Sequence, residues 1–125
     1  MLDVEVIGDA LPHEEVRRAA VLAAGSAGVD DGHVAIAFVD EDEIAALNAR
    51  HRGRAEPTDV LSFPVDEDAP PLGPRELGDV VICPEHTADL LEAVVHGVLH
   101  LTGMDHERDE GEMLAVQAEL LGWLR

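Results

Sequence analysis

Apolar residues in this chain form only short runs, which are bounded mostly by charged residues, glycine and proline. No window reaches the roughly 18 to 20 uninterrupted apolar residues that a membrane-spanning helix needs. A chain of 125 residues is long enough to bury one hydrophobic core and too short for two. We therefore expect residues 1–125 to form one soluble domain.

The order of the short runs predicts the strands of a small sheet. Residues 2–7, LDVEVI, alternate apolar and acidic side chains, as a half-buried strand does. Residues 33–40, HVAIAFVD, are apolar on both faces and predict a central strand. Two more strands are expected over 59–65 and 77–83, and Pro64 favours an edge position for the first of them.

The remaining segments predict helices. Asp40 with Glu43, and Asp109 with Glu112, have the spacing of a capping box at a helix start. Residues 66–76 have no period and are expected to form a loop. Together these features predict an α+β domain, in which a small four-stranded mixed sheet packs with about four helices. The helices are expected to run from Pro12 to about Gly25, from Asp40 to about Arg52, from Pro84 to Thr102, and onward from Asp109.

The charge balance restricts the possible partners. The chain has 27 acidic residues against 8 basic ones, all arginine, and a formal net charge of −19. Such a surface favours solubility and repels a polyanion at long range. A nucleic acid would therefore need a local basic cluster, and the segment RHRGR offers one with Arg50, Arg52 and Arg54. We expect neither a DNA nor a membrane partner.

The cysteine content and the N-terminus indicate the compartment. The single cysteine, Cys83, excludes an internal disulfide bond and a thiolate zinc site, and it is compatible with a reducing environment. Asp3 and Glu5 interrupt the first apolar stretch, and no basic segment precedes it, so no secretory peptide can be read there. We expect a cytoplasmic protein.

The segment HGVLHLTGMDH, residues 96–106, carries three histidines that are either satisfied core residues or one metal site. His96 and His100 are four residues apart, so a helix places both on one face, near enough to reach one ion. If the helix continued, His106 would lie about 9 Å further along its axis. Gly103 permits the helix to end and the chain to turn back, which favours a shared metal site.

Three neutral imidazoles with one open position describe a catalytic zinc site, because structural sites fill all four positions with protein ligands. Imidazole also suits copper, nickel and iron. Asp105 either orients a ligating imidazole or is only a turn residue.

The spacing H-x-x-x-H-x-x-G-x-x-H is also that of the metzincin peptidases, which carry a glutamate directly after the first histidine. Here that position is Gly97, so Glu92 or Glu107 would have to act as the base from elsewhere. This argues against a peptidase. We also expect Gly97 to leave room beside the metal for a bulky substrate.

The histidine segment closely resembles the signature of the YbeY family, bacterial endoribonucleases also described as ribosomal RNA maturation factors. Residues 47–64, LNARHRGRAEPTDVLSFP, and 77–83, LGDVVIC, are similar to two other recurrent blocks of that family. The chain departs from the family at Met104 and His51, where an aromatic residue and tyrosine are common. The segment between Cys83 and His96 is also shorter than usual, as if two helical pieces had merged.

The resemblance implies a zincin-like α+β fold with a metal site at the end of a helix in the C-terminal half. It also implies metal-dependent cleavage of single-stranded RNA, in 3′-end maturation of small-subunit ribosomal RNA and in ribosome quality control. Single-stranded RNA, ribosomal RNA and the small ribosomal subunit are then the expected partners. A non-catalytic assembly factor that keeps the metal for stability is the alternative.

Carried over by position, His96, His100 and His106 match the ligands of one Zn²⁺ ion per chain. Arg52 and His96 match catalytic positions, although an arginine at the end of a helix also complements the helix dipole without any catalytic role. Further residues expected near the metal or the substrate groove are Arg50, Arg54, Thr58, Asp59 and Asp105.

Overall fold

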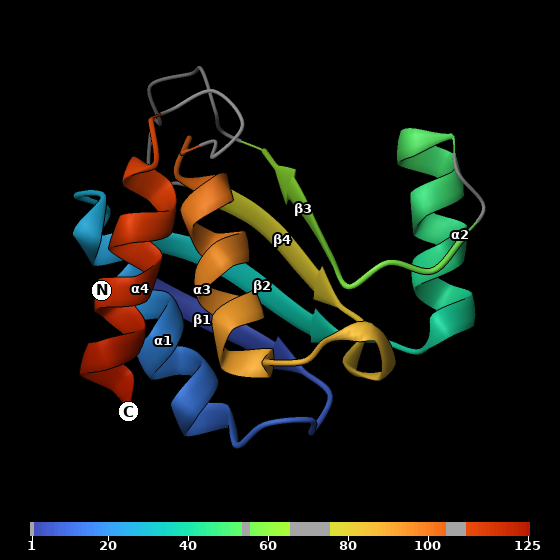
Figure 1. Ribbon diagram of the computed structural model, residues 1–125, viewed down its shortest axis with the longest axis horizontal. Coiled ribbons are helices and arrows are strands. Elements are labelled where there is room, and N and C mark those ends of the chain that lie inside the picture. Colours follow the sequence, from blue (N-terminus) through green and yellow to red (C-terminus); the bar gives the residue numbers. More distant parts are fainter. Residues whose placement is uncertain (1, 54–55, 66–75, 105–109) are drawn as a thin grey trace.

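The computed structural model describes residues 2–53, 56–65, 76–104 and 110–125, without the side chain of Arg52 (Figure 1). In these ranges the chain is an α+β fold with a four-stranded sheet, as predicted. Its elements are β1 (Leu2–Ile7), α1 (His13–Ser26), β2 (Gly32–Phe38), α2 (Glu41–Arg52), β3 (Val60–Pro64), β4 (Glu76–Ile82), the short 3₁₀ helix η1 (Pro84–His86), α3 (Leu90–Leu101) and α4 (Glu112–Leu124).

The sheet is mixed and has the strand order β1-β2-β4-β3. The pairs β1–β2 and β2–β4 are parallel, whereas β3 runs antiparallel to β4. The predictions of a central strand for β2 and of an edge position for β3 are therefore confirmed. Gly78 in β4 has a φ of +126°, and a Cβ there would lie 2.0 Å from the carbonyl oxygen of Phe63. Only glycine permits this approach of the two strands.

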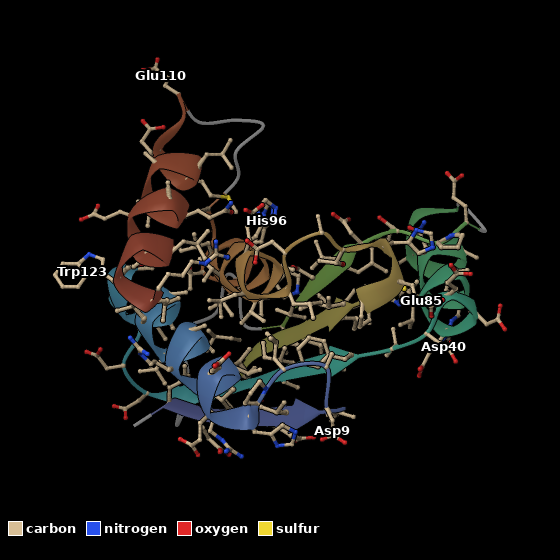
Figure 2. The ribbon with its side chains drawn as sticks, turned by 60° about the horizontal axis from the view of Figure 1, so that its bottom comes forward. Asp9, Asp40, Glu85, His96, Glu110 and Trp123 are labelled. Carbon is tan, nitrogen blue, oxygen red and sulfur yellow. The ribbon has the colours of Figure 1, made fainter. Side chains whose placement is uncertain are left out.

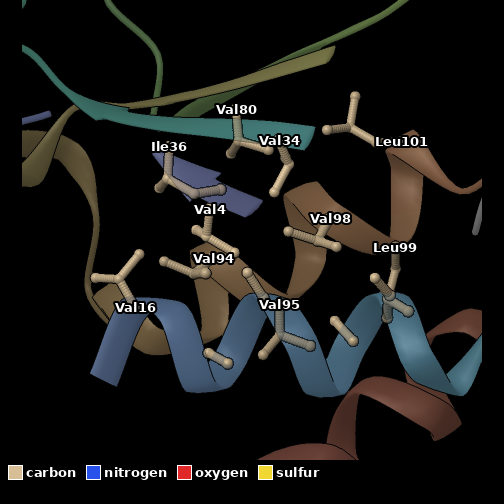
Figure 3. Packing of buried hydrophobic residues seen from close by; sticks show 14 of the residues in the cluster. Val4, Val16, Val34, Ile36, Val80, Val94, Val95, Val98, Leu99 and Leu101 are labelled. Atoms are coloured by element: carbon tan, nitrogen blue, oxygen red, sulfur yellow. The ribbon is translucent and has the colours of Figure 1, made fainter. Parts of the chain in front are cut away.

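Helices α1, α3 and α4 cover one face of the sheet (Figure 1). The side of α1 that carries Val16, Ala19, Ala20 and Ala23 is fully buried, and α1 and α3 pack together over the strands (Figure 3). Because the buried side chains come from all these elements, they form the main core. It includes Val4, Val16, Ala19, Ala20, Ala23, Val34, Ile36, Val80, Ile82, Val94, Val98, Leu99, Leu101, Met113 and Leu120.

Helix α2 covers the other face at the β3–β4 end of the sheet. Val81 and Cys83 alternate with the core residues of β4 and therefore point away from α3. They pack with Ile44 of α2 and Leu61 of β3 in a second, smaller cluster. The sheet thus separates α2 from α3, and residues 80–83 form a continuous apolar run because both of their faces are buried.

The prediction of one helix from Pro84 to Thr102 is wrong, and so is the idea that two helical pieces have merged. The chain forms η1, becomes extended at Thr87 and Asp89, and starts α3 only at Leu90. Thr87 Oγ1 donates to the carbonyl oxygen of Cys83 (2.7 Å), and Asp89 Oδ1 accepts from the Glu92 N–H (3.2 Å). Such side-chain bonds to the backbone compete with a continuous helix.

The start of α4 also differs from the prediction. Gly111, with a φ of 100°, stands at its N-cap, and no side chain caps the helix there. Asp109, expected in that role, lies outside the described residues, as do residues 66–75 of the predicted loop, while Glu76 already belongs to β4. In the ranges that the structure describes, no helix has the length and apolar character needed to cross a bilayer.

Candidate metal centre

Helix α3 presents two histidines side by side. Its buried residues, among them Val94, Val98 and Leu101, face the core, whereas His96 and His100 are half-buried. Figure 2 shows His96 on the side of α3 that points away from the sheet. The two ring centroids are 4.7 Å apart with an interplanar angle of 75°, and the two Nε2 atoms are 3.2 Å apart. The predicted one-turn spacing therefore places both Nε2 atoms within reach of one ion.

Gln117 of α4 orients the first of these rings. Its Oε1 accepts a hydrogen bond from Nδ1–H of His96 over 2.8 Å, and the residue is only 8% exposed. Gln117 is not among the site residues predicted from the sequence, although one signal was available. It is the polar residue on the inner face of α4, between the buried Met113 and Leu120.

Gly97 has a different role from the predicted one. A Cβ at this position would lie 2.4 Å from Cγ1 of Val80, because α3 crosses β4 there. Ser62 of β3 also donates to the Gly97 carbonyl oxygen over 3.4 Å. The expectation that Gly97 makes room beside the metal is wrong, since the missing side chain makes room for the sheet. A peptidase glutamate does not fit at this position without moving the helix.

The described donor atoms fit one metal ion. A tetrahedral zinc site with Zn–N distances of about 2.0 to 2.1 Å places its ligand nitrogens about 3.3 Å apart, close to the separation found here. Within the described ranges no group of three histidine, cysteine or carboxylate side chains gathers around a common point. His106 and Asp105 lie outside those ranges. The described chain thus offers two of the three ligands expected from the sequence.

The residues of the predicted substrate groove are only partly described. Arg50 is exposed on the last turn of α2, and Gly53, with a φ of 72°, caps the end of this helix. The side chain of Arg52, and Arg54, are not described. The arginine strip beside the metal therefore stays a prediction.

The described contacts of Thr58 and Asp59 hold the start of β3. Thr58 Oγ1 donates to Asp59 Oδ1 over 3.3 Å, and the same oxygen accepts from the Val60 N–H over 2.8 Å. The Asp59 carbonyl oxygen accepts from the Cys83 N–H over 2.8 Å.

A separate hydrogen bond connects α2 to the segment that follows it: the buried Asn48 donates through Nδ2 to the carbonyl oxygen of Glu56 over 2.9 Å. It ties the segment after α2 back to the helix.

The mixed sheet, α3 and its paired imidazoles define an α+β domain of the zincin-like class. The family model described as Endoribonuclease YbeY matches residues 9–125. The chain belongs to the YbeY endoribonuclease family.

Individual relatives agree with this assignment. Endoribonuclease YbeY of Macrococcus caseolyticus is 36% identical over 97% of this chain and 94% of that protein. The Nocardia farcinica protein of the same name is 39% identical over 89% and 72%, respectively. The solution structure of TM1509 from Thermotoga maritima has a TM-score of 0.61 to this structure at 27% identity, covering 97% of this chain and 88% of that one.

Proposed function

We propose that this protein is a metal-dependent endoribonuclease that cleaves single-stranded RNA, in the 3′-end maturation of small-subunit ribosomal RNA and in ribosome quality control. The observation that carries the proposal is the pair of Nε2 atoms, 3.2 Å apart on α3, in a chain of the YbeY endoribonuclease family. Family membership supports the hydrolysis of RNA. The convergent imidazoles support its dependence on a metal.

In this proposal His96, His100 and His106 hold one Zn²⁺ ion. When bound, zinc lowers the pKa of a water molecule toward about 7 and polarises a phosphoryl oxygen, which is the chemistry that phosphodiester hydrolysis needs. Gln117 holds the ring of His96 in place through the 2.8 Å hydrogen bond. Arg52 is proposed to bind a phosphate of the RNA, since the guanidinium fork offers paired donors to its oxygens.

The arginines at the end of α2 and just after it in the sequence can offset the net charge of −19 locally. We propose that Arg50, Arg52 and Arg54 form a local positive strip for the RNA backbone. Replacing all three by alanine should weaken RNA binding and reduce its dependence on salt, because fewer counterions are released. Unchanged affinity of this variant would show that the strip does not bind RNA. Ribosomal RNA, the small ribosomal subunit and a cytoplasmic location complete the proposal.

The proposal is tested by cleavage of a labelled single-stranded RNA. Zinc-loaded protein, chelated protein and the His100→Ala variant are prepared identically, with His13→Ala, a half-buried histidine at the start of α1, as the matched control. Cleavage by the loaded wild type and by His13→Ala, but not by the other two samples, is expected. A wild-type protein that holds one zinc ion and cleaves nothing would contradict the nuclease and favour an assembly factor.

A further inference from the structure

We infer that Gln117 is a positioning residue of the metal centre, which selects the tautomer of His96 that can bind a metal and makes the docking of α4 part of the site. The inference rests on the metal-binding part of the proposed function and is independent of the RNA substrate.

The position of Gln117 is unusual for its chemistry. Its neighbours on the same face of α4, Met113 and Leu120, are buried in the main core. A buried primary amide is stabilised only when it is hydrogen-bonded, and an apolar side chain of similar size would be easier to bury. Gln117 therefore has a role that packing alone does not explain, and its oxygen lies 2.8 Å from Nδ1 of His96.

This hydrogen bond decides which nitrogen of the imidazole carries the hydrogen. A neutral imidazole has one N–H group and one lone pair, and the amide oxygen can only accept. The hydrogen of His96 is thus held at Nδ1, and the lone pair remains at Nε2. Nε2 is the atom that lies 3.2 Å from Nε2 of His100. Without the amide, His96 would lose the partner that holds its hydrogen at Nδ1.

The same contact joins two helices. His96 belongs to α3 and Gln117 to α4, and the proposed third ligand, His106, lies between these helices in the sequence. Any ion that binds more tightly when His96 is oriented must, by linkage, stabilise the docked position of α4. Metal binding and α4 docking should therefore strengthen each other.

The test compares metal affinity among the wild type, Gln117→Leu and Gln117→Glu, with Glu119→Leu on the exposed side of α4 as the matched control. The probe is zinc alone, titrated against a chromophoric chelator, and the visible spectrum of the cobalt-loaded protein reports ligand geometry. Loss of a hydrogen-bonding partner of a ligating histidine weakens metal binding by about 10- to 100-fold. We expect that loss for Gln117→Leu, with a changed cobalt spectrum. Gln117→Glu keeps an acceptor and should retain the affinity, as should Glu119→Leu.

Urea unfolding of the metal-free proteins separates positioning from packing. We expect metal-free Gln117→Leu to be about as stable as the wild type, and zinc to raise its unfolding midpoint less than that of the wild type. In a His96→Ala background, Gln117→Leu should have no further effect on zinc affinity. Wild-type zinc affinity in Gln117→Leu would overturn the inference and leave the proposed nuclease untouched. If Gln117→Leu does not fold, Gln117→Met replaces it, and the same affinity criterion applies.

Discussion

Gly97 lies where α3 crosses β4, and its missing side chain sets how closely the helix approaches the sheet. Gly97→Ala should force apart α3 and Val80, because the new Cβ would lie 2.4 Å from a methyl carbon of that residue. Overpacking of this kind costs about 1 to 3 kcal/mol. The free energy of unfolding, measured with urea, should fall by that amount.

Gly122→Ala is the matched control for this change. Gly122 lies on the exposed side of α4, and an added Cβ meets no atom within 4 Å. Alanine there should stabilise the protein by up to about 1 kcal/mol, through helix propensity alone. Adding Val80→Ala to Gly97→Ala should restore part of the loss, since the two side chains compete for one space. A Gly97→Ala protein as stable as the wild type would show that the helix can shift freely.

His33 makes the sheet's stability depend on pH. Its Nδ1 lies 2.7 Å from Glu76 Oε2 and its Nε2 lies 3.4 Å from Glu5 Oε1, so it bridges all three parallel strands. Partial burial lowers the pKa of His33, but the hydrogen bond and charge of Glu76, with smaller contributions from Glu5 and Asp3, outweigh it and raise the pKa above 6.5. Asp79 lies close enough to interact with the same group.

A histidine whose pKa is raised in the folded state stabilises the fold when protonated. This contribution is fully present below the unfolded pKa of about 6.5 and is lost as the pH rises through the folded value. His33→Gln should therefore destabilise the protein at pH near 5.5 more than at pH near 9, as measured by urea unfolding. Glu76→Gln should bring the pKa of His33 down, which NMR titration of the ring can follow. An equal loss at both pH values would contradict this prediction.

At the residue scale, the sequence predicted what depends on local spacing. The pairing of His96 with His100 follows from one helical turn, and it was found as expected. Gln117 was missed because its role requires α4 to lie against α3, which no local pattern reveals. Gly97 was misinterpreted for the same reason, since the sequence does not show that Val80 lies opposite.

At the scale of elements, Asp89 decides where α3 begins. Its Oδ1 accepts from the Glu92 N–H, and its Oδ2 pairs with the Arg125 guanidinium. Asp89→Ala removes both interactions and should cost about 1 to 2 kcal/mol, mostly from the lost cap. Asp89→Asn keeps a capping oxygen and should lose only the ion pair, about 0.2 to 1 kcal/mol for partly exposed groups. Equal losses in the two variants would contradict the capping role.

The ionisation of Asp89 also predicts how this contribution to stability changes at low pH. The hydrogen bond from Arg125 lowers the pKa of Asp89, and it outweighs burial, which acts in the opposite direction. Its contribution is present above the unfolded pKa of about 3.9 and is lost as the pH falls through the folded value. The difference in unfolding free energy between the wild type and Asp89→Asn should accordingly vanish in strong acid.

The boundaries of helices and strands, like the site residues, could be predicted only where a local sequence signal marks them. The strands and the first two helices were predicted closely, because alternation, Asp40 and Gly53 are local signals. The prediction of a helix starting at Pro84 was wrong at Thr87 and Asp89, because their side chains form hydrogen bonds with the backbone. Such residues favour caps and turns, but they also occur inside helices at some cost in stability. The sequence alone therefore did not distinguish one long helix from a turn followed by a capped helix.

For the molecule as a whole, the sheet separates two environments. The main core joins α1, α3 and α4 and supports the histidine pair, whereas α2 packs through the smaller cluster around Ile44 on the opposite face. The proposed metal ligands and the proposed arginine strip therefore depend on different parts of the core. A destabilising change at Ile44 should therefore weaken RNA binding more than it weakens zinc binding.

The net charge of −19 acts on the whole molecule at once. Like charges spread over the surface repel one another and oppose the compact state, and salt screens this repulsion over a Debye length of about 10 Å at 0.1 M. The melting temperature should therefore rise as NaCl increases from low concentration toward about 0.5 M. RNA binding should show the opposite trend, because a local arginine cluster that releases counterions binds more weakly as salt increases. Thermal melting followed by circular dichroism and RNA binding measured over the same salt series test the two trends together. A melting temperature that falls with salt would mean that surface ion pairs, such as Asp89 with Arg125, outweigh the general repulsion.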